Sequence, residues 1–196
     1  MSVSIITTTY NDAHTIDRFI RSIVPQLRRG FEWVITDAHS DDGTWDAIEN
    51  VAKGNKRIGA IRYDTQIPRG VGRHYGAGLS RGKVLIHAID SDVIYRPGAM
   101  ELVVKAFRRG GRKPIAGDSY FVISREDYFK VGGYPPMNVG EDFALYSFLS
   151  KAAIPVVSRR LNVWEEDHND VRPLRNLAAF GSDENKTEPL PRRQGI

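Results

Sequence analysis

Residues 34–46 read VITDAHSDDGTWD, and this stretch decides how the rest of the sequence is interpreted. It begins with an apolar run that is typical of a strand. Directly after that run come Asp37, Ser40, Asp42, Gly43 and Thr44, in the spacing D-x-x-S-x-D-G-T. Polar and acidic side chains at this density are unsuited to a core, whereas ligands of open α/β sheets bind outside the carboxyl ends of the strands. The stretch therefore predicts a nucleotide pocket at the end of a strand.

On either side of this stretch, strand and helix patterns alternate along the chain. Strands are expected at residues 3–9, 31–36 and 58–63, which are rich in β-branched and apolar residues, and at 84–89, a continuous apolar run. Helices are expected from residue 16 to near Gly30 and at residues 44–53, 70–81 and 97–107, the first of them capped by Asn11 and Asp12. The order βαβαβαβ predicts an α/β fold with a mainly parallel central sheet and helices on both faces.

The pattern changes after Gly111. Strands are expected at residues 119–124 and 154–158, a Gly-Gly-Tyr-Pro-Pro turn within 128–136, and a helix at 141–151. We therefore expect one domain over residues 1–165, with a nucleotide-binding half at 1–110 and a second half at 111–165. Residues 166–196 are polar and contain three prolines, which predicts a C-terminal segment with a disordered end.

Composition sets limits on the class of protein. A hydrophobic fraction of 41% and a charged fraction of 27% are typical of a soluble globular protein. The absence of cysteine excludes disulfides, thiolate metal sites and thiol nucleophiles. The net charge of +4 favours a negatively charged partner, but the basic residues are scattered along the chain, which argues against nucleic acid.

The sequence carries no obvious targeting signal. Its first residues lack the basic region and apolar core of a signal peptide, and no apolar run approaches the roughly 20 residues of a membrane-spanning helix. We therefore expect a cytoplasmic protein without a transmembrane segment, while peripheral membrane contact through the arginines stays open.

A second group of acidic residues, Asp90-Ser91-Asp92, ends the most apolar strand. Two carboxylates two residues apart in extended chain point to the same side. Carboxylate oxygens are the ligands of Mg²⁺ or Mn²⁺, which would bridge a diphosphate. An isolated D-x-D is usually a solvated turn, but its place after a buried strand, in the middle of the βαβ series, favours a metal site held by Asp90 and Asp92.

Between the two acidic groups lies a glycine-rich segment with two arginines, Arg69 and Arg73. Their guanidinium groups are suited to pairing with the diphosphate of a nucleotide. Solvent exposure without a ligand is an equally good interpretation of both.

Four elements of the chain, taken in order, resemble the glycosyltransferases of family 2, which have the GT-A fold. The first is Thr7-Thr8-Thr9-Tyr10-Asn11 at the end of strand one, and the second is the D-x-x-S-x-D-G-T stretch. The third is Asp90-Ser91-Asp92, and the fourth is the segment FKVGGYPPMNVGEDFALYSFL at 129–149. The resemblance covers roughly residues 3–151 and implies a minimal catalytic domain, similar to the compact members known from archaeal viruses.

The resemblance implies a sugar transfer from a UDP- or GDP-sugar to an acceptor hydroxyl, with inversion, assisted by Mn²⁺ or Mg²⁺. Asp142 would be the general base, and it is expected on the inward face of its helix with Leu145, Tyr146 and Leu149. Asp92 would hold the metal, with Asp90 close to the ribose and the metal. His168, after an acidic run, is placed to complete the metal shell. Donor contacts are expected from Thr8, Tyr10, Asp12, Asp37, Ser40, Arg69, Arg73, Asp90 and Ser91.

Two other functions stay open at this point. A sugar nucleotidyltransferase shares the layered α/β build and the metal requirement, but it would carry a basic glycine-rich loop after strand one, which residues 7–11 lack. A non-catalytic nucleotide-sugar-binding protein would have the same pocket without turnover. The acceptor, whether glycan, lipid or protein, is not indicated by any motif.

Overall fold

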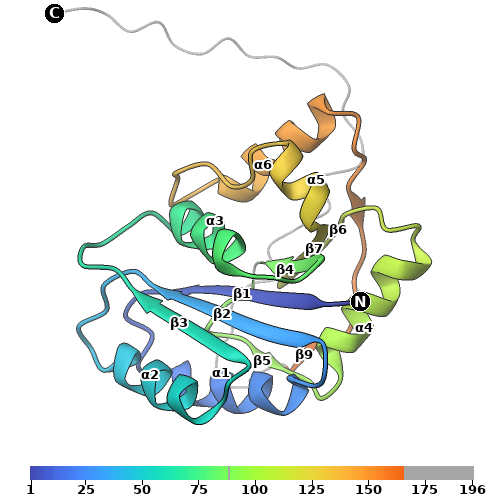
Figure 1. Ribbon diagram of the computed structural model, residues 1–196. Helices are drawn as coiled ribbons and strands as arrows, with labels where there is room; N and C mark the ends of the chain where they lie inside the picture. The colour runs from blue at the N-terminus through green and yellow to red at the C-terminus, as the bar shows by residue number, and fades with distance from the viewer. Residues whose placement is uncertain (88, 166–196) are drawn as a thin grey trace, which may run out of the picture.

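The computed structural model describes residues 1–87 and 89–165, in which a central sheet carries helices on both faces (Figure 1). The sheet has seven strands in the order β3-β2-β1-β4-β7-β6-β8. Their bounds are β1 (Val3–Thr9), β2 (Phe31–Asp37), β3 (Ile58–Arg62), β4 (Val84–His87), β6 (Ile115–Gly117), β7 (Tyr120–Ser124) and β8 (Val157–Ser158). A separate antiparallel pair joins β5 (Ile94–Tyr95) to β9 (Trp164–Glu165).

The helices divide between the two faces of the sheet. Below it in Figure 1 lie α1 (Ile16–Ile23), which continues into the short 3₁₀ helix η1 (Val24–Gln26), α2 (Thr44–Gly54) and α4 (Ala99–Arg109). Above it lie α3 (Arg69–Leu79), α5 (Arg125–Lys130) and α6 (Glu141–Lys151). Strand residues alternate between two apolar cores, as the period of two requires: Val84 and Ile86 pack into the lower core and Leu85 into the upper one.

Strands β1 to β4 are parallel, so their carboxyl ends meet at one edge, which we call the carboxyl end of the sheet. The opposite edge, where the chain begins, is the amino end, on the right in Figure 1. Strand β7 then pairs antiparallel to β4, with Val84 opposite Ser124, and joins the second half of the chain to the first. The expected α/β fold with a mainly parallel sheet is confirmed.

Several local expectations were wrong or incomplete. Helix α1 ends at Ile23 rather than near Gly30, because Pro25 has no amide hydrogen to continue the helix and the next turn is 3₁₀. Its N-cap is Thr15, with no side-chain capping bond, so Asn11 and Asp12 do not cap it. Strands β5, β6 and β9 and helix α5 were not predicted, since short elements carry little periodic signal.

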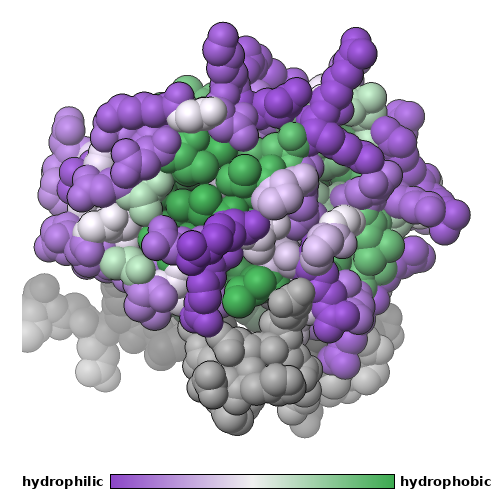
Figure 2. Space-filling model, turned by 90° about the horizontal axis from the view of Figure 1, so that it is seen from below, coloured by the Kyte–Doolittle hydropathy of each residue, from purple (hydrophilic) through white to green (hydrophobic). Residues whose placement is uncertain are grey.

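Helix α3 approaches the sheet closely because it carries glycine on its inner side. A Cβ atom added to Gly72 would lie 2.4 Å from Cγ2 of Thr8, and one added to Gly76 would lie 2.8 Å from Ile6. On the opposite face, partly buried hydrophobic residues of α1 and α2, among them Ile20 and Val51, pack against the core. Figure 2 shows the molecule from below, with apolar surface in the middle of the face and hydrophilic side chains around it. Within the described residues, no helix is both long and apolar enough to cross a membrane.

Candidate active site

The carboxyl end of the sheet collects the residues that the sequence marked for chemistry. Tyr10 and Asp12 follow β1, and Asp37 and Ser40 lie at the end of β2. The segment Asp90-Ser91-Asp92 follows β4, while Arg69 and Arg73 occupy the first half of α3 and Asp142 the first turn of α6. All of these lie at or beside the carboxyl ends of β1, β2 and β4, as the βαβ order predicts.

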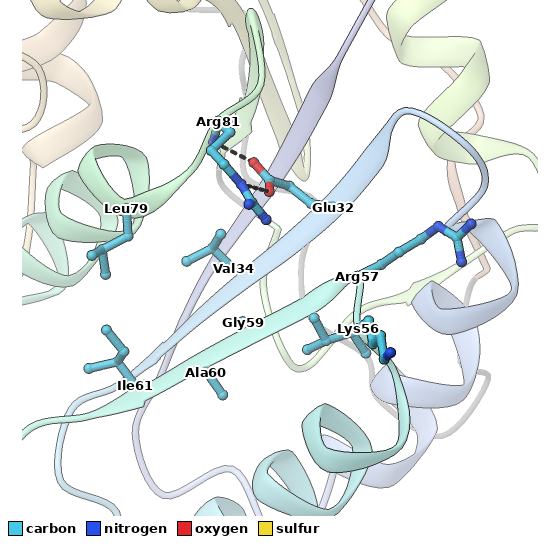
Figure 3. A pocket seen from close by; sticks show the side chains of 10 residues that line it. Glu32, Val34, Lys56, Arg57, Gly59, Ala60, Ile61, Leu79 and Arg81 are labelled. Atoms are coloured by element: carbon cyan, nitrogen blue, oxygen red, sulfur yellow. Dashed lines mark hydrogen bonds and ion pairs between the residues drawn. The ribbon is translucent and has the colours of Figure 1, made fainter.

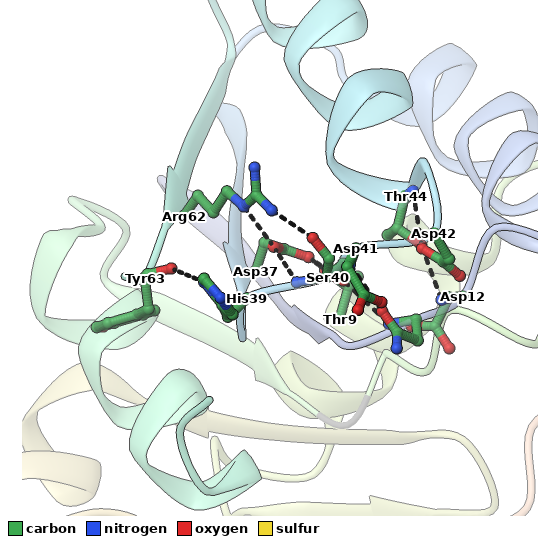
Figure 4. A network of polar contacts seen from close by, with 11 residues as sticks. Thr9, Asp12, Asp37, His39, Ser40, Asp41, Asp42, Thr44, Arg62 and Tyr63 are labelled. Carbon is green, nitrogen blue, oxygen red and sulfur yellow. Dashed lines mark hydrogen bonds and ion pairs between the residues drawn. The ribbon is translucent and has the colours of Figure 1, made fainter. Parts of the chain in front are cut away.

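Asp37 is the buried centre of the network at the end of β2 (Figure 4). Its carboxylate accepts hydrogen bonds from Thr9 Oγ1 at 3.1 Å, from the Ser40 amide at 2.9 Å and from Ser40 Oγ at 2.5 Å. Arg62 Nε lies 3.7 Å away, and its guanidinium also donates to the Ser40 carbonyl. With no exposed surface, Asp37 shapes the loop that follows β2. Its direct contact with a nucleobase stays a prediction.

The D-D-G-T turn after this loop starts α2. Gly43 has φ 99°, a left-handed conformation that favours glycine. Asp42 Oδ1 accepts from the amide of Thr44 at 3.0 Å and from its hydroxyl at 2.6 Å, while Thr44 Oγ1 accepts from the amide of Asp12 at 2.8 Å. These bonds, visible in Figure 4, tie the loop after β1 to the loop after β2.

The loop after β1 is tied to the Asp90-Ser91-Asp92 segment as well. Ser91 Oγ donates to Asp12 Oδ2 at 2.5 Å. Burial raises the pKa of Asp12, and the hydrogen bond from Ser91 partly offsets this effect. Asp12 therefore connects the loop after β1 to the acidic loop after β4. Its expected contact with the donor stays a prediction.

Arg73 is the residue around which the two halves of the chain meet. It is 4% exposed, and its guanidinium lies 3.0 Å from Asp142, 3.1 Å from Glu141 and 3.3 Å from Asp90. Burial alone would lower its pKa, but Tyr134 and the three carboxylates raise it, so the side chain stays cationic at any working pH. The expected pairing of Arg73 with a diphosphate is not what this arrangement shows, because carboxylates surround the guanidinium. Arg69 is more than half exposed, 3.7 Å from Glu141, and keeps that possibility.

The orientation of α6 differs from the expected one by one residue. Its buried residues are Glu141, Leu145 and Leu149, spaced by four, so Glu141 lies on the inward face. Asp142 lies at the edge of this face and is only partly buried, as is Tyr146, because each residue turns the helix by about 100°. The Asp142 side chain is 36% exposed at the rim, where a general base has to be reachable.

Tyr134, from the Gly-Gly-Tyr-Pro turn, was missed as a functional residue. Its hydroxyl donates to Asp142 Oδ1 at 2.8 Å, and its ring packs 5.3 Å from the guanidinium carbon of Arg73. Burial and the Asp142 charge raise its pKa well above the usual value, so the hydroxyl stays protonated and able to donate. Tyr134 lies within the segment 129–149 that resembles family 2, but the sequence alone did not indicate that it bonds to Asp142.

Behind this cluster lies His87, at the end of β4. The side chain is fully buried and stacks on Tyr128 at 4.7 Å between ring centroids, and neither ring nitrogen has a hydrogen-bond partner among the described residues. Burial lowers its pKa far below the usual value, and Arg73 lowers it further, so the ring is neutral. The strand assignment of His87 is confirmed.

The remaining expected contacts differ in how accessible they are. Tyr10 is 44% exposed and open to a ligand. Thr8 hydrogen-bonds Thr36 Oγ1 at 2.9 Å and lies against Gly72, so it packs beneath α3. His168 lies outside the described residues.

The donor set after β4 fits a hard divalent cation in part. Asp90 and Asp92 offer carboxylate oxygens, and the Asp90 side chain is 43% exposed. Desolvation raises the pKa of Asp90 to about 6, which Arg73 partly counters. Within the described ranges no group of three or more His, Cys, Asp or Glu side chains is arranged to hold a metal. Mg²⁺ is commonly bound by one or two carboxylates together with substrate phosphates, so the two aspartates suit that mode.

Comparison with known proteins agrees with this geometry. The family model for glycosyl transferase family 2 matches residues 4–150, which include all four elements named above. The chain belongs to this family. The family 2 domain is 28% identical over 110 residues to an uncharacterized glycosyltransferase of Nostoc sp., which covers 55% of this chain and 33% of the relative. It is 27% identical over 99 residues to the putative teichuronic acid biosynthesis glycosyltransferase TuaG of Bacillus subtilis, with 50% and 39% covered.

Solved structures show the same fold. The mannosyltransferase PcManGT of Pyrobaculum calidifontis, in complex with GDP-Man and Mn²⁺, aligns with a TM-score of 0.71 at 16% identity, covering 84% of this chain and 56% of that one. S. aureus TarS, residues 1–349 in complex with UDP-GlcNAc, aligns with a TM-score of 0.70 at 14% identity, covering 86% and 60%. The GT-A fold of this family 2 domain is thereby confirmed. The domain spans only a third to two fifths of the curated relatives' length.

Proposed function

We propose that this family 2 domain transfers a sugar from a UDP- or GDP-sugar to an acceptor hydroxyl, with inversion and with help from Mn²⁺ or Mg²⁺. The observation that carries the proposal is the position of Asp142. This half-exposed carboxylate is linked to Asp90, beside the expected diphosphate, through the single guanidinium of Arg73. An acid that receives a proton thus lies next to an acidic pair that suits a metal–diphosphate complex.

The chain's own residues would position the donor. Tyr10 presents an exposed ring at the end of β1, and the loop fixed by Asp37 and Ser40 forms the wall beside it. Arg69, exposed in the first turn of α3 and 3.7 Å from Glu141, would reach a phosphate oxygen of the donor. Asp90 and Asp92 would hold the cation, which when bound neutralises the charge that develops on the leaving nucleoside diphosphate.

Asp142 would accept the proton from the acceptor hydroxyl. Arg73 and Tyr134 both bond to its Oδ1, and neither of these bonds uses Oδ2. The two donors stabilise the carboxylate and fix its plane, so Oδ2 can face an acceptor from the opposite side of the sugar. General-base assistance of this kind contributes about 10²–10⁴-fold to rate.

Thermal unfolding with UDP, GDP, ADP and CMP, each with and without Mn²⁺, tests the donor site. A ligand at 100 times its Kd adds about 2.7 kcal/mol of stability, which is roughly 5–10 °C in Tm for a domain of this size. We expect one nucleotide to give a Mn²⁺-dependent shift in Tm that is lost in Asp92→Ala. The shift should be kept in Asp118→Ala, because Asp118 is an exposed acid outside the Asp90-Ser91-Asp92 segment. No shift with any nucleotide at millimolar concentration would contradict the proposal. Release of free sugar from the matching nucleotide sugar then separates turnover from mere binding.

A further inference from the structure

Most loops at the amino end of the sheet are basic, although the connection into β8, at residues 152–156, holds no charged residue. Four connections lead from a helix into β2, β3, β4 and β6, at residues 25–30, 53–57, 79–83 and 108–114. Together they contain eleven lysines and arginines and no aspartate or glutamate. The cations are Arg28, Arg29, Lys53, Lys56, Arg57, Arg81, Lys83, Arg108, Arg109, Arg112 and Lys113. Because these strands run in the same direction, all four connections lie along one end of the molecule, which we call the basic end.

Every one of these side chains belongs to an exposed residue. Three make ion pairs with neighbouring acids: Arg28 with Glu101 at 2.7 Å, Lys53 with Glu49 at 2.9 Å, and Arg81 with Glu32 at 3.3 Å. The other eight make no ion pair with the described part of the chain. Glu126, at the start of α5, is a further exposed acid near this end. The positive charge is therefore largely uncompensated.

Helix dipoles explain only part of this charge. The C-terminal ends of α1 to α4 point toward the basic end, and cations in a last helical turn are stabilised there. That effect falls off within the last turn. Lys83 and Lys113 lie four residues past the ends of α3 and α4, next to the strands that follow. These residues need another explanation.

A groove of about 330 Å³ opens at this end between α3 and the edge strand β3 (Figure 3). Val34, Ile61 and Leu79 contribute apolar surface, and Leu79 is 50% exposed. Gly59 leaves open space above the strand, since a Cβ there would have no neighbour within 4 Å. Lys56, Arg57 and Arg81 line the same groove, together with one acid, Glu32, which pairs with Arg81 and leaves two cations there that make no ion pair with the described residues. A cationic rim beside an apolar floor matches a molecule with an anionic head and an apolar body.

We propose that the basic end binds the anionic headgroup surface of a lipid bilayer. From β3 to β6 the connections span five strand spacings, roughly 24 Å, which makes a broad surface rather than a narrow channel. Single-stranded nucleic acid is usually bound with exposed aromatic side chains on which bases stack. The exposed aromatic residues Tyr10, Tyr75, Phe129 and Phe143 lie outside these connections, whereas Leu79 lies within them. A bilayer is therefore the partner that the surface fits best.

Sedimentation with vesicles tests this proposal. The protein is mixed with phosphatidylcholine vesicles, or with vesicles in which part of this lipid is replaced by phosphatidylglycerol, at low and high ionic strength. We expect binding to the anionic vesicles only, and weaker binding at high salt, because surface charges are screened. A lack of binding to anionic vesicles at low salt would overturn the proposal, and so would preferential binding to a DNA or RNA fragment.

A matched pair of variants places the binding on the basic end. Each cation near an anionic membrane contributes roughly fivefold to partitioning. Arg112→Gln with Lys113→Gln should therefore weaken vesicle binding about 20–30-fold. Arg159→Gln with Arg160→Gln removes the same charge from exposed positions after β8 and should have little effect. An equal loss in both variants would show that net charge alone is responsible and would overturn the proposal. Nucleotide-dependent thermal shifts, which test the donor site at the other end, should be unchanged in both.

Discussion

The two ends of the sheet are made of the same kind of element, loops between strands and helices, yet they differ in chemistry and in packing. At the carboxyl end the loops hold acidic residues that are tied together by hydrogen bonds, as in the pair Asp12–Ser91 and the cluster around Arg73. At the amino end they hold exposed cations with few partners. The net charge of +4 does not reveal that acidic and basic residues gather at opposite ends of the sheet. The loops at the carboxyl end are fixed relative to one another by hydrogen bonds and ion pairs. The loops at the amino end mainly expose charged side chains to solvent.

The sharpest test of this contrast is Asp142→Asn. The amide has the shape of the carboxylate but cannot accept the acceptor's proton, so turnover should fall by about 10²–10⁴-fold while nucleotide binding persists. The measurement is initial rate beside nucleotide-dependent thermal shift. Glu126→Gln, an exposed acid near the amino end, should leave the rate unchanged. Full turnover in Asp142→Asn would remove this residue from the role of base.

Arg73→Met should give the largest loss of stability. Glu141 is 2% exposed and would be left as a buried carboxylate without its closest cation. Removing one partner of a buried ion pair costs about 3–5 kcal/mol. Arg109→Met, at the amino end, makes no ion pair with the described residues and should cost less than about 0.5 kcal/mol. Urea unfolding of both variants measures the difference, and similar losses would contradict the contrast between the two ends.

Helix α3 runs from the carboxyl end of the sheet to the amino end. Substitutions of its glycines therefore allow the packing at the two ends to be compared within one helix. Gly72→Ala places a Cβ 2.4 Å from Thr8 Cγ2, near the carboxyl end, and should cost about 1–3 kcal/mol through overpacking. Gly78→Ala, near the amino end, meets nothing within 4 Å and should stabilise the helix by about 0.5–1 kcal/mol. Free energies of unfolding from urea titration report both, and effects of the same sign would refute the expectation.

His87 should make the domain less stable in acid. The unfolded chain binds a proton on this histidine below pH 6.5, its ordinary pKa, whereas the buried ring resists protonation because its pKa is lowered. Stability is therefore fully present above pH 6.5 and is lost as pH falls, by up to about 1.4 kcal/mol per pH unit. His87→Met should show a smaller loss of unfolding free energy between pH 6.5 and 5.5 than the parent chain. Parallel pH curves would mean that the pKa of His87 is the same in the folded and the unfolded chain, which would contradict this expectation.

The sequence predicted the long elements and the edge at which the site lies, because periodicity and βαβ order are local or topological signals. It did not predict the role of Arg73, since that role depends on Asp90 and Glu141, which are 17 and 68 residues away. It did not predict that Glu141 is the more deeply buried acid of α6, because Leu145 and Leu149 match a face drawn through either Glu141 or Asp142. The short ribbon of β5 and β9 has two residues a strand, too few for any pattern to show.

The antiparallel pairing of β4 with β7 has a consequence for how the domain melts and moves. These strands belong to the two halves expected from the sequence, and four residue pairs join them directly, from Val84 with Ser124 to His87 with Phe121. A continuous hydrogen-bonded sheet leaves no hinge between the halves, so they cannot open and shut as two lobes. Any motion that accompanies substrate binding is therefore expected in the loops at the carboxyl end, and heating should unfold the described chain in one cooperative transition.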